Sequence, residues 1–368
     1  MDFEKHLKDL KASPEMQSRH KDLSDMRNSA KATLWAKGAI ALDETNVVRA
    51  LRFACTGCGK CCDTPPGMNL LEALRLADRF VLKVELRSVG KMDPTNPFDQ
   101  HHLDMTYPEL DLDADEGRRE RFSENLTAQA KTLGLPFTKT EGPASDLAVR
   151  IMFTDLMDET GACPMRKEDG FCSIYGDRPA KCRVVPFDET IPLEDAGDAA
   201  TFSIMHLITV KQGTCQVDAG APVIWEDGVF ADPEIEEAHE SVLFATGDDE
   251  RAASKSVADE VLQFKSKETE IDRSELERYC ATREADDPAP MSSMVPVLYR
   301  LISEGFISSE QAVGLLEKQI MVIEDRLKNT PKDARPNPVY GVTYAVMLQD
   351  WLSLYSEVVA GWKTQKRL

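Results

Sequence analysis

The fold of this chain depends on the stretch Cys55-Thr56-Gly57-Cys58-Gly59-Lys60-Cys61-Cys62, which places four cysteines within eight residues. Four more cysteines follow at wider spacing: Cys163, Cys172, Cys182 and Cys215. Core packing does not require four sulfurs so close together, whereas thiolates gathered in this way commonly share a metal ion or a metal cluster. The sequence therefore predicts a domain that folds around metal.

Length and composition set the frame for this domain. With 368 residues, the chain is long enough for two domains or for one large domain with additions. An apolar fraction of 42% suits a globular core, and an aromatic fraction of 7% with 14 methionines favours a mostly helical, aliphatic interior.

The charge balance restricts the partners. Acidic residues outnumber basic ones by 64 to 44, which gives a net charge of -20. Such a surface repels phosphate backbones and anionic lipid, so we expect neither nucleic acid nor a membrane as partner. The N-terminus lacks the apolar core of a signal peptide, which predicts a cytoplasmic protein. Thiols stay reduced there, so metal ligation is favoured over a disulfide framework.

Cys55, Cys58 and Cys61 have the C-x-x-C-x-x-C spacing that lets a loop curl around one metal centre. Gly57 and Gly59 relieve the crowding in such a loop. Ferredoxin-type clusters combine similar spacing with a distant cysteine that precedes proline, and Cys163-Pro164 offers that fourth position.

Cys62 complicates this arrangement because neighbouring side chains diverge along a regular backbone. Cys61 and Cys62 therefore do not easily bind the same ion, and Cys62 either binds a second centre or stays a free reactive thiol. The eight cysteines suffice for two four-sulfur sites, with either zinc or iron–sulfur chemistry. Cys280 lies in a helical stretch and is predicted to be an ordinary buried cysteine.

Bunched thiolates also need compensating positive charge. As a group, the basic residues near the cysteines favour an anionic centre, although each alone is typical of an ordinary surface. These residues are Lys60, Arg166, Lys167, Arg178, Lys181 and Arg183.

Several elements can be predicted from local patterns. A helix begins at about Asn69, with Glu72 as its capping partner, and its apolar stripe extends to Val81. Leu147–Phe153 is predicted as a strand, and Asp169-Gly170 as the turn of a hairpin with a cysteine on each arm. The further predicted elements are strands in 201–210 and 217–230, a helix after Gly247, a helix from about Ser308, and a C-terminal helix from Tyr344 to Trp362.

The predicted fold class is α+β: a small irregular metal-bound cysteine-cluster domain with short β-hairpins, surrounded by helices and followed by a helical C-terminal region. We expect a helical segment at 1–50 and the cysteine-cluster domain at 51–245, with an insertion at about 93–143. Residues 246–290 are expected to form a helix and an acidic linker, and 291–368 the C-terminal helical region. His101 and His102 lie in the insertion and are expected to be exposed, whereas His206 is expected in the core.

Two segments resemble motifs of the YkgJ-like cysteine-cluster family, a CxxCxxCC domain described as zinc- or iron-chelating. The opening motif matches 53–62, and the second matches Cys172–Arg183 followed by Pro186-Phe187. The resemblance implies metal binding through Cys55, Cys58, Cys61, Cys62, Cys163, Cys172, Cys182 and Cys215. It also implies a distant relation to flagellin lysine methylases, which are regarded as iron–sulfur enzymes that use S-adenosylmethionine. The chain lacks the C-x-x-x-C-x-x-C spacing of typical radical enzymes.

Three functions remain open. In the first, an iron–sulfur centre carries out redox or group-transfer chemistry, with a protein as substrate or partner. In the second, zinc stabilises a protein-interaction module. In the third, the thiolates exchange metal ions with a partner. Eight ligands exceed the need of one structural site and favour the first function, whereas the absence of a familiar substrate motif favours the second.

Overall fold

The computed structural model describes residues 14–62, 66–90, 117, 120–124, 127, 135–136, 147–156, 162–188, 191, 193–243, 248–282, 290–330 and 342–365. Most of the predicted insertion at 93–143, with His101 and His102, and most of the acidic linker lie outside these residues. No helix within the described ranges is both long enough and apolar enough to cross a membrane.

Two small antiparallel sheets provide the β structure. In the first, the strand order is β1-β2-β6-β7, with β1 Ile40–Leu42, β2 Val48–Arg52, β6 Val223–Glu226 and β7 Val229–Phe230. In the second, the order is β4-β5-β3-β8, with β4 Leu135–Pro136, β5 Leu147–Asp155, β3 Leu82–Gly90 and β8 Met291–Ser292. The strand predicted at Leu147–Phe153 is confirmed, and it pairs with β3 from Leu147↔Gly90 to Asp155↔Leu82.

Helices make up most of the remaining described structure, and the α+β class is confirmed. The longer helices are α2 Pro14–Ala36, α7 Leu193–Met205, α8 Pro233–Leu243, α9 Asp248–Thr269, α10 Arg273–Thr282, α11 Val295–Ser303, α12 Ser309–Asn329 and α13 Tyr344–Gln365. The short ones are α3 Leu70–Arg75, η1 Tyr175–Asp177, α6 Ala180–Arg183 and the π-helix η2 His206–Val210.

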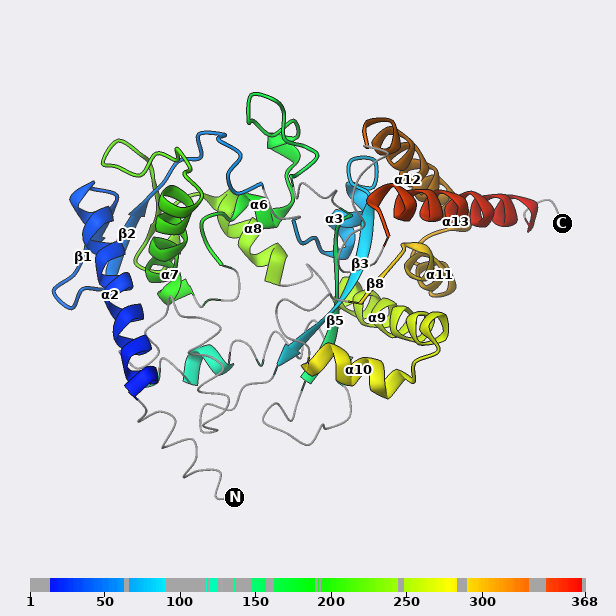
Figure 1. The fold of residues 1–368 in the computed structure, drawn as a ribbon, viewed down its shortest axis with the longest axis horizontal. Helices are drawn as coiled ribbons and strands as arrows, with labels where there is room; N and C mark the ends of the chain where they lie inside the picture. The colour runs from blue at the N-terminus through cyan, green and yellow to red at the C-terminus, as the bar shows by residue number, and fades with distance from the viewer. Residues whose placement is uncertain are drawn as a thin grey trace, which may run out of the picture.

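The buried side chains form two main hydrophobic clusters, which we call the small core and the large core. The small core joins α2, β1, β2, α7 and β6, with Leu51 and Trp225 among its buried members. The large core joins α3, β3, β5, α9 and α11 to α13, with Phe153 and Tyr355 at its centre. Figure 1 shows the first set of elements on the left and the second on the right.

Both predicted helix starts are confirmed by their caps. The Asn69 side chain accepts a hydrogen bond from the Glu72 backbone N–H at 2.8 Å, and the Glu72 carboxylate accepts one from the Asn69 N–H. Ser308 and Gln311 form the same reciprocal pair in front of α12. The helix after Asn69 ends at Arg75, however, and Val81 directly precedes β3 instead of extending the helix.

Two predictions of local structure were wrong. Residues 201–210 were predicted as strand, but they continue α7 and then form η2. Their β-branched residues are overridden by tertiary packing, since Ala200 and Ile204 contribute to the small core one helical turn apart. His206 is exposed and does not belong to the core.

The segment 1–50 contains both expected and unexpected structure. The helical expectation holds for α2, but β1 and the first residues of β2 follow it within the same segment. The tight connection between these two strands is held by Asp43, whose carboxylate accepts hydrogen bonds from Thr45 and Val47. The domain boundaries proposed from the sequence stay a prediction.

Candidate metal centre

The cysteine-rich segments connect the two cores. The chain leaves the small core at β2, passes through Cys55 to Cys62, and enters the large core at α3. It leaves the large core at β5, passes through Cys163, Cys172 and Cys182, and returns to the small core at α7. The cysteines therefore lie where two connections run between the same pair of cores.

A first group of sulfurs forms because the segment after β2 pairs with the segment after η2. Ala54 and Gln216 exchange two backbone hydrogen bonds of 3.0 Å, so Cys55 and Cys215 follow as neighbours on antiparallel segments. The Thr56 hydroxyl extends this pairing by its contact with Thr214 at 3.1 Å.

The thiols of this first group are coupled to one another. Burial acts to raise the pKa of Cys58, but backbone hydrogen bonds from Lys60 and Thr214 and a side-chain hydrogen bond from Cys215 outweigh burial and lower it. Burial, followed by the charges of Cys58 and Cys55, raises the pKa of Cys215 to about 12. Cys61 couples to Cys58 and acts on Cys215, and across the boundary it also acts on Cys182. We count Cys55, Cys58, Cys61 and Cys215 as the first group.

A second group forms around the turn at Asp169-Gly170. The predicted hairpin is present as a tight turn closed by a single bridge between Arg166 and Cys172, and not as two full strands. The Asp169 carboxylate accepts a hydrogen bond from the Phe171 N–H at 3.0 Å, and Gly170 has a positive φ of 88°.

Cys62 belongs with this second group. Its backbone carbonyl accepts a hydrogen bond from the Cys163 N–H at 2.8 Å. A hydrogen bond from Cys61 lowers the pKa of Cys62, against burial and the charges of Cys163, Cys182 and Cys172. Burial, followed by the charge of Cys163, raises the pKa of Cys182 to about 12. Cys62, Cys163, Cys172 and Cys182 therefore form the second group.

The boundary between the groups falls between two adjacent residues. Cys61 donates its S–H to Cys62, and this hydrogen bond is the main reason why the pKa of Cys61 is raised. The sequence offered Cys163 as the fourth partner of Cys55, Cys58 and Cys61. In the structure Cys215 lies beside Cys55 and Cys58, and Cys163 lies beside Cys62.

Glycines allow the two cysteine segments to pack against each other. A Cβ atom on Gly57 would come within 2.2 Å of the Phe171 ring, and one on Gly59 within 2.4 Å of the Arg166 side chain. Both glycines have positive φ angles of about 70°. A larger residue at either position would be strained at this φ and would displace the Phe171 or Arg166 side chain, so these glycines serve both the turn and the close approach.

Positive charge reaches the sulfurs from two arginines in particular. The charge of Arg178 opposes the rise in the pKa of Cys182 that burial causes, and Arg178 lies 3.8 Å from the ring centre of Tyr175. The charge of Arg326, from α12, likewise opposes the rise in the pKa of Cys163 that burial causes. Arg326 also forms an ion pair of 3.0 Å with the buried Asp155. Arg178 was among the basic residues that the sequence singled out. Arg326 was not, because it lies far along the chain and approaches the cysteines only through the fold.

One carboxylate outside the cysteine groups also orders the site. Glu72 is 8% exposed, and its carboxylate accepts a hydrogen bond of 2.7 Å from the N–H of Ala180, the first residue of α6. The same carboxylate caps α3 through the Asn69 N–H. Glu72 therefore ties the Cys182 helix to the large core.

The donor set suits a thiophilic metal. None of the cysteines forms a disulfide, and each group offers four sulfurs, as tetrahedral zinc and iron–sulfur centres require. Within the described ranges, no three His, Cys, Asp or Glu side chains already have the arrangement of a closed metal site. Binding would therefore draw neighbouring sulfurs together. Cys280 is fully buried in the large core, as predicted.

Comparison with known proteins places this region in a family. Residues 54–215 match the CxxCxxCC family, described as a "putative zinc- or iron-chelating domain". This range contains both cysteine groups and ends at Cys215. Neither a curated protein nor a solved structure matches the chain. The implied relation to flagellin lysine methylases stays a prediction. The resemblance to the cysteine-cluster family is confirmed, because the model of the CxxCxxCC family covers residues 54–215.

Proposed function

We propose that the chain binds metal at two centres of four cysteines each. Cys55, Cys58, Cys61 and Cys215 would hold the first, and Cys62, Cys163, Cys172 and Cys182 the second. The observation that carries this proposal is that the two ends of the Cys55–Cys62 segment pair with different distant segments. Ala54 pairs with Gln216, next to Cys215, whereas the Cys62 carbonyl accepts a hydrogen bond from the Cys163 N–H. This division assigns each of the eight cysteines to one centre and explains why Cys61 and Cys62 can be adjacent, since they bind different metals.

We further propose that the metal is iron, in iron–sulfur centres that serve redox or group-transfer chemistry. The donors of both groups are sulfur alone, and the Gly57 N–H donates to the Cys55 sulfur at 3.4 Å. Hydrogen bonds of this kind tune the potential of iron–sulfur clusters. Cys55 and Cys61 are exposed, so the first centre is the one that a substrate or redox partner can reach.

Zinc remains the second candidate, in a structural or metal-exchange role, because cysteines of the second group pack against the large core. Cys163 and Cys172 pack against the large core, as expected for a site that fastens a fold. On this alternative the exposed first group would contact a partner or exchange ions with it. A protein partner suits both functions, and the proposed cytoplasmic location rests on the need to keep the thiols reduced.

Metal content separates iron from zinc. The protein should be purified without oxygen and assayed for iron, zinc and acid-labile sulfide, together with its visible spectrum. Iron with matching sulfide and broad visible absorption supports the proposal, and colourless protein with stoichiometric zinc refutes its iron part. Calorimetric titration of the iron-loaded protein with S-adenosylmethionine then tests whether group transfer from that cofactor is open to it.

Paired substitutions test the division into two centres. The double variant C58S/C61S alters one proposed centre and should lose about half of the bound metal, as either single variant does. The double variant C61S/C62S alters both centres and should lose nearly all of it. If C58S/C61S lost more metal than C61S/C62S, the division into two centres would be refuted. Cys280→Ala, outside both groups, is the control for loss of a thiol.

A further inference from the structure

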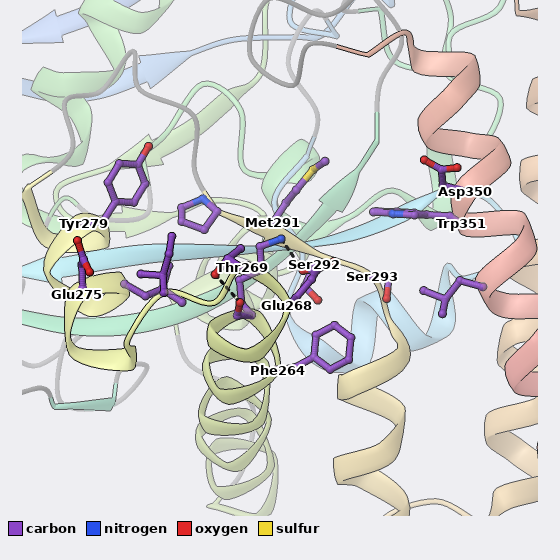
Figure 2. A pocket seen from close by; sticks show the side chains of 15 residues that line it. Phe264, Glu268, Thr269, Glu275, Tyr279, Met291, Ser292, Ser293, Asp350 and Trp351 are labelled. Atoms are coloured by element: carbon purple, nitrogen blue, oxygen red, sulfur yellow. Dashed lines mark hydrogen bonds and ion pairs between the residues drawn. The ribbon is translucent and has the colours of Figure 1, made fainter.

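A cavity lies among elements that carry none of the eight site cysteines. It has a volume of about 650 Å³ and is lined by residues of α9, α10, β8 and α13 (Figure 2). This volume is within the range of sites that bind small molecules. The function proposed for the cysteines makes no use of it.

The walls of the cavity are largely apolar and partly aromatic. Phe264 comes from α9, Leu276 from α10, and Trp351 and Leu354 from α13. Figure 2 shows Trp351 on one side of the cavity and Tyr279 on the other, with β8 and the end of α9 between them. Such walls suit the hydrocarbon or aromatic body of a ligand, and aromatic faces also attract cations.

The charged groups of the cavity are mostly negative. Three carboxylates line it, Glu268, Glu275 and Asp350, against one ammonium group, that of Lys265. Lys265 is paired with Glu268 at 2.6 Å, so its charge is already offset. Asp350 is exposed, and its side chain has no ion-pair partner among the described residues. The lining therefore repels anions and attracts cations.

We propose that this cavity binds a small organic cation with an apolar body, that is, an amphipathic amine. Its body would contact Phe264 and Trp351, and its ammonium group would approach the carboxylate of Asp350, which lies beside Trp351 in Figure 2. The combination of apolar walls and excess carboxylate carries the proposal, because either one alone would also suit ligands of other classes. It is independent of the metal chemistry.

A charge series of one ligand skeleton tests the proposal on the full-length protein. Phenethylammonium, phenethyl alcohol and phenylacetate share a phenyl body and differ in charge. Isothermal titration calorimetry should give the tightest binding for the ammonium ion, weaker binding for the alcohol and the weakest for the carboxylate. The preference should shrink with added salt. Equal affinities, no measurable binding of any of the three, or tighter binding of phenylacetate would overturn the proposal.

Substitutions then locate the binding. Asp350→Asn should weaken binding of phenethylammonium by up to about fivefold, with little effect on phenethyl alcohol. Glu357→Gln on the same helix removes a carboxylate outside the cavity and should leave both affinities unchanged. If Glu357→Gln weakens binding as much as Asp350→Asn does, the attraction comes from overall charge and the proposed site is refuted.

Discussion

Single residues decide how the cysteines are held, and the sequence reveals only some of them. The four-cysteine stretch, its glycines and Arg178 are visible because they are close together in the chain. The sequence predicts Glu72 only as a helix cap, and no local pattern points to Arg326. Glu72 binds the first residue of the Cys182 helix and Arg326 acts on Cys163, each across more than 100 residues of chain, a relation that no local pattern encodes. The grouping of the sulfurs was unpredictable for the same reason.

Glu72 offers a direct test of support around the site. Glu72→Ala leaves the buried N–H of Ala180 without its acceptor, which should lower the free energy of unfolding by about 1–3 kcal/mol. Metal content should also fall, since α6 carries Cys182. Glu72→Gln keeps an acceptor oxygen for the Ala180 N–H and should retain most of the stability and most of the metal content. Chemical denaturation and metal assays measure the two effects, and an alanine variant as stable as the native protein would contradict this role.

Asp43 should make stability depend on pH. Its hydrogen bond with the Thr45 hydroxyl, followed by that from Val47 and with help from Arg49, holds its pKa well below the ordinary value. Because the pKa of Asp43 is lower in the folded than in the unfolded protein, the ionised carboxylate stabilises the fold at pH values above its unfolded pKa. This stabilisation is lost as the pH falls through the folded pKa. Asp43→Asn should therefore flatten the loss of stability in acid, as followed by thermal unfolding. Glu44 is the exposed neighbour of Asp43, and Glu44→Gln should leave the acid dependence of stability unchanged. Identical pH–stability profiles for the two variants would contradict the role of Asp43.

At the scale of elements, prediction succeeded where the signal is local. The cap at Asn69, the helix start near Ser308 and the strand predicted at Leu147–Phe153 follow from short patterns, and all three are present. The strand Leu82–Gly90 was missed because its partner β5 lies far along the chain. Residues 201–210 were misassigned because their burial against the small core, and not their propensity, decides their structure.

The docking of α12 on the large core depends on one buried polar side chain. Gln319 is 1% exposed, accepts a hydrogen bond from the Leu82 N–H, and donates to the carbonyls of Ala77 and Phe80. Gln319→Leu should lower the free energy of unfolding by about 3 kcal/mol, because it leaves buried backbone groups unpaired. Gln349→Leu, exposed on α13, should change it by less than about 0.5 kcal/mol. Similar effects of both variants in urea denaturation would show that Gln319 is not the anchor.

At the scale of the whole molecule, the two cysteine groups lie at the junction of two unequal cores. Among the described residues, the large core contains 33 buried hydrophobic residues and the small core 14. A core of the smaller size is marginal on its own. Metal bound at both groups would tie the two connecting segments together, so the small core would share the stability of the large one.

Removal of metal should therefore separate the two cores. In metal-loaded protein, the amides of β2 and β6 should exchange with solvent hydrogen nearly as slowly as those of β3 and β5. After chelation, β2 and β6 should exchange faster while β3 and β5 stay protected, because the large core keeps its own burial. Adding metal back should restore protection to native protein but not to the C61S/C62S variant. If chelation accelerates both sheets equally, the cores unfold as one unit and the metal does not link them.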